Sequence, residues 1–318
     1  MTKIKKQPFL NIVITTYNRY NDLLNCLKSI KDSTYKNFSI IIIDDCSTDE
    51  TKYLNSFELK KKTNIKQKIA IIHNKKRLMM VKSRNLGAKK SKSKYILFID
   101  DDNIIDKKMI EILINFAEKH PEYGIIGPSM YYADGKLYMK YQIFNFFTGK
   151  TTGVIVKNSN PKEYYDSIGV PNVFLIRKSV FDKIGYFDSK IIQTFTEMDF
   201  GLKALKNEIK CCMLSAAKTI HNTYEKNNYT PRSLSGQFNQ TAYFLMRNRT
   251  IIITRYGNFF QKIIYFIFFS WFWPLIYSFF IILFLKFNIL KYYWCGFFDG
   301  LFYFFTRKIK NSLPRLMK

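Results

Sequence analysis

Three consecutive carboxylates, Asp100, Asp101 and Asp102, follow the apolar run of residues 95–99. Carboxylates this close repel one another unless a cation or an arginine neutralises them. Hard divalent cations take oxygen ligands and often keep substrate phosphates in their coordination shell. The cluster therefore predicts a divalent-metal site that bridges to a diphosphate, with Asp100 and Asp102 as ligands. The alternative is a solvated acidic turn that begins the next helix.

A second acidic pair, Asp44 and Asp45, follows the apolar run of residues 39–43. A carboxylate at such a position can accept a hydrogen bond from a nucleobase N–H or a ribose hydroxyl. The same pattern is typical of helix capping, for which Asp45 or Ser47 is suited. Both interpretations stay open for this pair.

Arg84 lies in the segment SRNLG, at the start of an expected helix. Its planar guanidinium is a bidentate donor that suits phosphate, and this makes Arg84 a candidate phosphate ligand. The alternative is an ordinary surface arginine.

Two further acids, Glu197 and Asp199, lie in the segment TEMDFG. A carboxylate within hydrogen-bond reach of a hydroxyl can take its proton, and the apolar neighbours Phe195 and Phe200 would keep such a base partly dry. The alternative is a solvated helix start, where acids favour the helix dipole.

Short apolar runs alternate with helical stretches over the first 130 or so residues. The expected strands are residues 10–15, 39–43, 68–72, 95–99 and 125–126; the expected helices are residues 21–30, 83–90 and 107–119, and another begins within 45–51, where Ser47 and Glu50 are spaced as a capping box. This alternation predicts right-handed βαβ units and a parallel sheet. Ligands of such sheets bind beyond the carboxyl ends of the strands, and that is where the polar clusters fall.

The C-terminal part changes character. Residues 263–285 carry no charge and have the length of one membrane-spanning helix, in which Pro274 is tolerated. A second apolar stretch, residues 292–305, is interrupted by Gly296, Asp299 and Gly300. We expect a membrane anchor, either a single span or a re-entrant or interfacial helix. A buried hairpin in a soluble protein is the alternative.

Composition limits the partners. The net charge is +27, and a basic surface attracts phosphates, although lysines spread along the chain also arise from composition alone. No arginine-rich tract or aromatic RNA-binding signature supports a nucleic-acid partner. Five cysteines without a CxxC pair argue against a disulfide framework or zinc ribbon and favour a reducing compartment.

The ordered segments IVITTYNR, IIIDDCSTD, SRNLGA and FIDDD resemble those of family-2 glycosyltransferases. The similarity continues in residues 171–177, 183–188 and 196–201, at His221 and at Arg247 and Asn248, and it covers roughly residues 9 to 255. It implies an α/β architecture, a Rossmann-like GT-A fold with a mixed, mainly parallel sheet flanked by helices, here followed by C-terminal hydrophobic helices. We expect a nucleotide-sugar-binding half in residues 1–128, an acceptor-binding half in 129–258, and membrane-associated helices with a basic tail in 259–318.

The resemblance also implies a role for each candidate residue. Nucleotide-sugar binding would fall to Thr16, Tyr17, Arg19, Asp44, Asp45, Arg84, Asp100 and Asp101. A Mn²⁺ or Mg²⁺ ion would be held by Asp100, Asp102 and His221, although a lone histidine is as often structural. The general base would be Glu197, with Asp199 as the alternative, because Thr196 replaces an acid that is common in the family.

The function implied is that of a metal-dependent, inverting glycosyltransferase. It would move a sugar from a nucleotide-diphosphate sugar to a hydroxyl of a lipid-linked or other glycan acceptor at the membrane. The absence of a QxxRW segment favours single addition over polymerisation. The catalytic domain is expected to face the cytoplasm, since the N-terminus reads as a strand rather than a signal peptide. A nucleotidyltransferase and an inactive membrane scaffold are the alternatives.

Overall fold

The computed structural model describes residues 8–156, 160–170, 172–221 and 239–316. The chain divides into two compact units, which are described separately below. The first unit holds Met1–Ile143, Gly153–Phe187 and Phe200–Glu225; the second holds Phe144–Thr152, Asp188–Asp199 and Lys226–Lys318. The boundaries expected at residues 128 and 258 divide the chain by role and stay a prediction.

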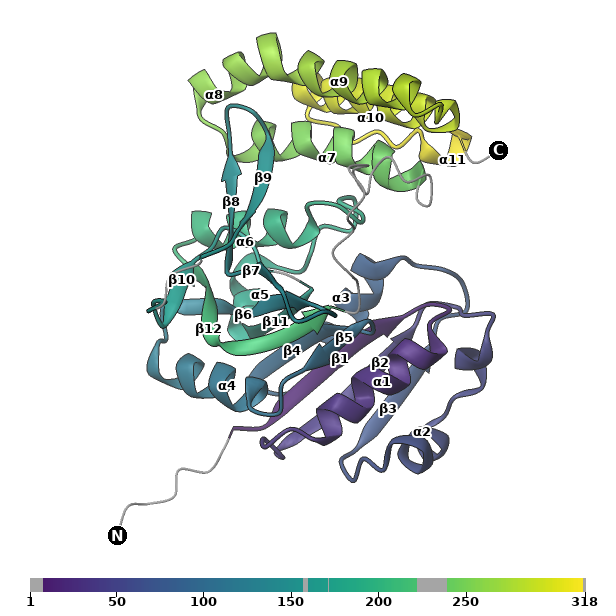
Figure 1. The fold of residues 1–318 in the computed structure, drawn as a ribbon, viewed down its shortest axis with the longest axis vertical. Coiled ribbons are helices and arrows are strands. Elements are labelled where there is room, and N and C mark those ends of the chain that lie inside the picture. The colour runs from purple at the N-terminus through teal and green to yellow at the C-terminus, as the bar shows by residue number, and fades with distance from the viewer. Residues whose placement is uncertain (1–7, 157–159, 171, 222–238, 317–318) are drawn as a thin grey trace. The chain divides into compact units, whose positions relative to one another are not determined.

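The first unit is built on a ten-stranded mixed sheet (Figure 1). The strand order is β10–β12–β6–β11–β4–β1–β2–β3, with β5 on β12 and β7 on β6. Strands β1 (Leu10–Thr16), β2 (Phe38–Asp44), β3 (Ile69–His73) and β4 (Tyr95–Asp100) are parallel neighbours, as expected. They are rich in Ile, Leu and Val because both faces of this part of the sheet are covered by helices.

The other half of the sheet is mixed. Strand β11 (Val173–Arg177) runs antiparallel to both β4 and β6 (Tyr123–Tyr132), and β12 (Lys210–His221) runs parallel to β6. The shorter strands are β5 (Asn103–Ile105), β7 (Leu137–Met139) and β10 (Tyr164–Asp166), while β8 (Tyr141–Asn145) and β9 (Lys150–Val154) form a separate hairpin. Strand β6 is much longer than the expected strand at 125–126, since β12 pairs with it over most of its length.

Helices cover the two faces of the sheet. They are α1 (Tyr20–Lys31), α2 (Ser56–Thr63), α3 (Met80–Lys90), α4 (Met109–Lys119), α5 (Lys178–Ile184) and α6 (Thr196–Lys206), whose first turn belongs to the second unit. One core joins Ile12 to Leu27 and Leu113, and the other joins Val13 to Ala88. Gly87 lets α3 lie on β1, because a Cβ at this position would collide with the Val13 side chain.

One local prediction was right only in part, since a helical turn begins before residue 51 but the Ser47 capping box does not form. Residues 45–48 are not helical, and a short 3₁₀ turn, η1 (Glu50–Tyr53), begins only after Asp49, whose side chain accepts the Thr51 N–H at 3.0 Å. The Ser47 hydroxyl accepts the Asn18 N–H at 2.9 Å instead of capping a helix. Pairing of two strand-end loops therefore overrides the capping-box pattern.

The second unit is mainly helical. It contains α7 (Asn239–Tyr256), α8 (Phe259–Ile264), a π turn η3 (Tyr265–Phe269), α9 (Ser270–Leu283), a 3₁₀ turn η4 (Phe287–Ile289), α10 (Leu290–Thr306) and α11 (Leu313–Leu316). Helix α10 packs closely on α7, since Gly296 faces the Tyr243 carbonyl and Gly300 faces Thr250. The buried Asp299 accepts hydrogen bonds from the Tyr243 hydroxyl and from Ser312. The two glycines and the aspartate that interrupt this apolar stretch are thus packing and hydrogen-bonding positions.

Helix α9 presents an apolar outer surface. Together with α8 and η3 it makes one continuous helix, Phe259–Leu283, long and apolar enough to cross a membrane, and it is the only such helix in the described ranges. Only 17% of its most apolar window is buried. In Figure 1, within this unit, α9 runs along α10, α8 lies to the left of them, and α7 lies beneath.

Candidate active site

The carboxyl ends of three neighbouring strands bring the N-terminal polar clusters together. In the sheet register Thr15 of β1 lies opposite Asp100 of β4, and Thr16 lies opposite Asp44 of β2. Thr16 and Asp44 are buried, at 3% and 1% exposure, and form the edge of the sheet. The expected gathering of polar residues at this edge is therefore present.

Two arginines bind the three consecutive carboxylates. The Arg84 Nη2 atom lies 2.5 Å from Asp100 Oδ1, and Arg84 itself is 1% exposed. Arg19 Nη1 lies 3.0 Å from Asp101 Oδ1 and 2.7 Å from Asp102 Oδ2. The surface-arginine alternative for Arg84 is wrong, because its side chain is buried beneath the acidic cluster. The alternative of a solvated acidic turn is wrong for Asp101, which is 3% exposed.

The carboxylates of this cluster differ in their ionisation. Burial raises the pKa of Asp101 to about 7, against the lowering effect of the Arg19 charge. Burial also opposes ionisation of Asp102, but the hydrogen bond and charge of His221, together with Arg19, hold its pKa below the ordinary value. Asp102 is therefore ionised at neutral pH, as a carboxylate ligand of a cation must be.

His221 reaches Asp102 through strand pairing. It is the last residue of β12 and lies opposite Asn103 of β5, the residue that follows the three aspartates. Its Nε2 atom is 3.4 Å from Asp102 Oδ2. Among the described residues no three His, Cys, Asp or Glu side chains gather as a metal cage. Asp102 nevertheless offers the oxygen ligand that a hard divalent ion takes, with His221 beside it, and such an ion is commonly held by one or two carboxylates and completed by substrate phosphates.

Asp44 and Asp45 are both held by hydrogen bonds. Asp44 accepts the Ser47 N–H at 3.0 Å, and its other oxygen lies 2.7 Å from His73 Nδ1. Asp45 accepts from the Leu78 and Met79 backbone N–H groups at 2.8 Å, and also from Asn74 and Ser83. Asp45 thus fixes the loop that leads into α3. The expected contacts of this pair with a nucleobase stay a prediction.

The two candidate bases begin α6, in the second unit. Asp199 is 3% exposed and is bound by Arg255 Nη1 at 2.8 Å and by the Tyr256 hydroxyl at 2.9 Å. Burial raises the pKa of Asp199, although Arg255 and Tyr256 favour its charged form. Glu197, two residues earlier, is only partly buried. Gln193 and Phe195, just before the helix, have left-handed backbone angles of φ 63° and 65°, which fix its start.

The sequence matches a family model along more than half of its length. The model, "Glycosyl transferase family 2", matches residues 11–185, which contain every candidate of the first unit except His221. The chain belongs to glycosyl transferase family 2. The predicted family and enzyme class are confirmed.

Relatives of this family-2 chain carry the same class name. It is 28% identical over 204 residues to an uncharacterized glycosyltransferase of Haemophilus influenzae, covering 62% of each chain. It is 24% identical over 187 residues to glycosyltransferase GlyG of Streptococcus pneumoniae, covering 57% of this chain and 60% of GlyG. An uncharacterized glycosyltransferase of Rickettsia conorii is 39% identical over 111 residues, 35% of this chain and 17% of that one. The chain thus spans less than two thirds of the length of each relative.

Solved structures confirm the fold. The crystal structure of GalNAc-T7 with UDP, GalNAc and Mn²⁺ superposes with a TM-score of 0.60 at 16% identity, covering 82% of this chain and 54% of that one. Residues 1–349 of Staphylococcus aureus TarS superpose with a TM-score of 0.53 at 17% identity, covering 97% and 77%. The expected α/β GT-A-like architecture of the family-2 domain is therefore correct.

Two candidate residues at the carboxyl edge of the sheet escaped the sequence analysis. His73 ends β3 and pairs with Asp44 in register, so the strand pattern held a signal for it. The Arg77 guanidinium lies 3.9 Å from the centre of the Tyr17 ring, a stack that no spacing predicts. Pro171, within the segment expected on the acceptor side, lies outside the described residues.

Proposed function

We propose that this family-2 chain is a metal-dependent, inverting glycosyltransferase that moves a sugar from a nucleotide-diphosphate sugar to a hydroxyl of a glycan acceptor at the membrane. The observation that carries the proposal is the approach of Asp102 and His221 beside Arg19, at the carboxyl end of a family-2 sheet. Asp102 and His221 would hold Mn²⁺ or Mg²⁺, and a bound divalent ion stabilises the negative charge that develops on a leaving diphosphate. GalNAc-T7, a neighbour in fold, was crystallised with Mn²⁺.

When the donor and its metal ion bind, Arg19 would leave Asp102 and contact a donor phosphate instead. Its guanidinium contacts the same Asp102 oxygen that lies near His221. A cation at that oxygen competes with Arg19, whose side chain is 41% exposed and free to turn. The released guanidinium is then available to a donor phosphate. Arg84, held on Asp100 and buried, would keep the acidic turn in place.

Glu197 is proposed as the general base. A base must offer a carboxylate oxygen to the acceptor hydroxyl. Asp199 is committed to Arg255 and Tyr256 within a buried network, and it would fix the first turn of α6 instead. Glu197 lies on that same turn and is more exposed. The acceptor hydroxyl would lose its proton to Glu197 as its oxygen attacks the sugar carbon from the face opposite the departing diphosphate.

The helix Phe259–Leu283 is proposed as the membrane anchor, lying in the interface rather than crossing it. Helix α9 packs lengthwise on α10, with Trp271 on Phe297 at 4.8 Å and Tyr277 on Tyr293 at 4.9 Å between ring centres. A spanning α9 would draw α10, and the arginine-bearing α7 packed on it, toward the hydrocarbon, where charged groups are expensive. The catalytic domain would face the cytoplasm.

The proposed activity is tested with a panel of nucleotide-sugars. The true donor should raise the melting temperature in the presence of Mn²⁺, since a ligand that binds only the folded state stabilises it. A donor labelled in both the sugar and the α-phosphate then identifies the group transferred. Transfer of the nucleotide monophosphate would make the chain a nucleotidyltransferase, and no turnover of any donor would leave only a scaffold.

A further inference from the structure

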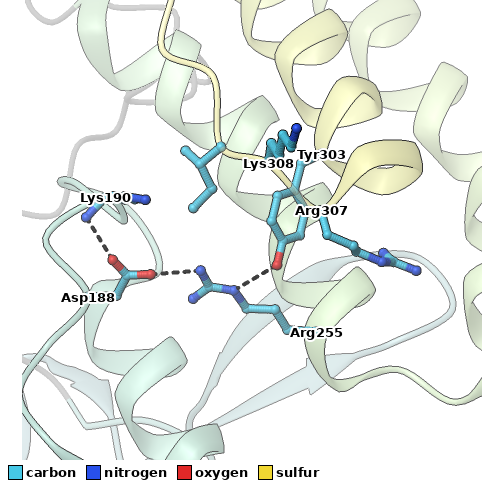
Figure 2. Close-up of a pocket in the computed structure, with 7 residues that line it drawn as sticks. Asp188, Lys190, Arg255, Tyr303, Arg307 and Lys308 are labelled. Carbon is cyan, nitrogen blue, oxygen red and sulfur yellow. Dashed lines mark hydrogen bonds and ion pairs between the residues drawn. The ribbon is translucent and has the colours of Figure 1, made fainter.

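A basic pocket of about 400 Å³ lies in the second unit. Four cations line it, Lys190, Arg255, Arg307 and Lys308, together with Asp188 and Tyr303. They come from three places in the sequence: the loop before α6, the end of α7 and the end of α10. Figure 2 shows Asp188, Arg255 and Tyr303 joined in a chain, while the charged ends of Arg307 and Lys308 extend away from it.

The inner charges of this pocket are already paired. Arg255 Nη2 lies 2.7 Å from Asp188 Oδ2, and its Nε donates to the Tyr303 hydroxyl at 3.2 Å. Its Nη1 binds Asp199 behind the pocket. Burial opposes ionisation of Asp188, but the Lys190 backbone N–H and the Arg255 charge hold its pKa below the ordinary value. Arg255 is thus balanced by two carboxylates.

As far as the structure describes the chain, the outer cations form no ion pair with a carboxylate, although the charge of Lys190 also helps to lower the pKa of Asp188. Within the described part of the chain, no carboxylate lies within 4 Å of the charged groups of Lys190, Arg307 or Lys308. All three side chains are exposed and long enough to turn toward a ligand. Arg307 also occupies the left-handed position that closes α10, with φ 59°, where glycine is the usual residue. The pocket therefore offers a cluster of cations to an anion, next to a tyrosine hydroxyl.

We propose that this pocket binds the phosphate or diphosphate group of a phosphate-bearing acceptor. This rests on the proposed transferase function. Arginine and lysine form charge-assisted hydrogen bonds to phosphate oxygens, and several cations around one cavity suit a doubly charged group. The alternative is that the pocket binds no ligand. Cations near a helix C-terminus interact favourably with the helix dipole, and this alone would account for Arg307 and Lys308.

The pocket is tied to the candidate base by a single side chain. Arg255 contacts both Asp188, which lines the pocket, and Asp199, which lies on the first turn of α6 with Glu197. A phosphate bound at the pocket would thus be held on the same scaffold that orients Glu197. Phe302 and Phe305, in the last turn of α10, are exposed at 39% and 67%, although neither lines the pocket.

The experiment compares two double variants of the full-length protein in detergent. Arg307→Gln/Lys308→Gln removes two pocket cations, and Lys286→Gln/Lys291→Gln removes two exposed cations elsewhere in the same unit. Binding of sodium pyrophosphate and of farnesyl diphosphate is measured by calorimetry with chelator present, so that no metal-dependent donor site contributes. We expect the pocket variant to bind at least about tenfold more weakly, and the control variant to bind as wild type.

The variant Arg307→Gly serves as a control for misfolding. Glycine suits the left-handed backbone at this position, so this variant should melt no lower than wild type and still bind the probes more weakly. Equal losses of probe affinity in the two double variants would attribute the effect to overall charge and overturn the proposal. Binding of the probes by Arg307→Gly with wild-type affinity would overturn it as well.

The probes also separate the sources of the phosphate. Tighter binding of farnesyl diphosphate than of pyrophosphate indicates a lipid-linked acceptor, and equal binding indicates a soluble one. The binding assay needs no nucleotide-sugar, so the two proposals can fail separately. If the protein transfers sugar but the pocket does not bind the probes, only the proposed phosphate site is refuted. If the pocket binds the probes but the protein transfers nothing, only the proposed transferase function is refuted.

Discussion

The distinction between Glu197 and Asp199 can be tested through stability as well as turnover. Asp199→Asn removes one carboxylate from a buried ion pair, and breaking such a pair costs about 3–5 kcal/mol because a charge is left uncompensated. Arg255 keeps Asp188 at 2.7 Å, and its side chain is 21% exposed. We therefore expect a smaller loss, about 2–3 kcal/mol. At about 2–4 °C for each kcal/mol, the melting temperature should fall by roughly 5–10 °C.

Glu197→Gln should behave in the opposite way. The side chain is only partly buried, so the free energy of unfolding should change by about 0.5 kcal/mol or less. Turnover should fall by about 10²–10⁴, the contribution of a general base, with donor affinity unchanged. The assay pairs thermal unfolding with steady-state transfer, and Asp182→Asn, which removes an exposed acid, serves as the control for charge. A stable Asp199→Asn that has lost turnover, beside a Glu197→Gln that turns over normally, would refute the reasoning.

Three further predictions follow from the geometry. Asp102→Asn should abolish metal-dependent transfer while the fold survives, and full activity in a protein verified by elemental analysis to be metal-free would contradict it. Burial raises the pKa of Asp101 to about 7, so the folded state binds the proton more tightly and stability falls as pH rises from about 4 to about 7. Asp101→Asn should remove that slope, measured by denaturant unfolding with chelator; an unchanged slope would assign it to another group. Gly296→Ala should lower the free energy of unfolding by about 1–3 kcal/mol through overpacking against Tyr243, whereas Cys295→Ala should cost less.

The cluster of polar residues at the carboxyl edge of the sheet was predictable because strand patterns place these residues. Four apolar runs, each followed by polar residues, specify a parallel sheet whose carboxyl ends share an edge. Thr16, Asp44 and Asp100 meet there by register alone. His221 also arrives by register, although its partner strand β5 is too short for the sequence pattern to reveal.

The roles inside that edge were less predictable, since they depend on side chains that meet across loops. Nothing in the spacing shows that Arg19 binds Asp101 and Asp102. Asp45 likewise looks equivalent to Asp44 in sequence, but its two carboxylate oxygens accept hydrogen bonds from the backbone of the loop before α3. Hydrogen bonds of this kind join residues with no common period, so they leave no pattern.

The C-terminal unit shows the same limit with a different physical cause. By periodicity and length, α9 and α10 are both apolar stretches. In the structure, however, Gly296 and Asp299 place one face of α10 against Tyr243 of α7. Apolar exposure then decreases from α9 to α10, and α7 buries Arg247 and Asn248. A bilayer would therefore meet this unit from the α9 side, where large apolar side chains are exposed. That gradient, rather than the length of one helix, is the observation that favours the proposed interfacial anchor over a spanning one.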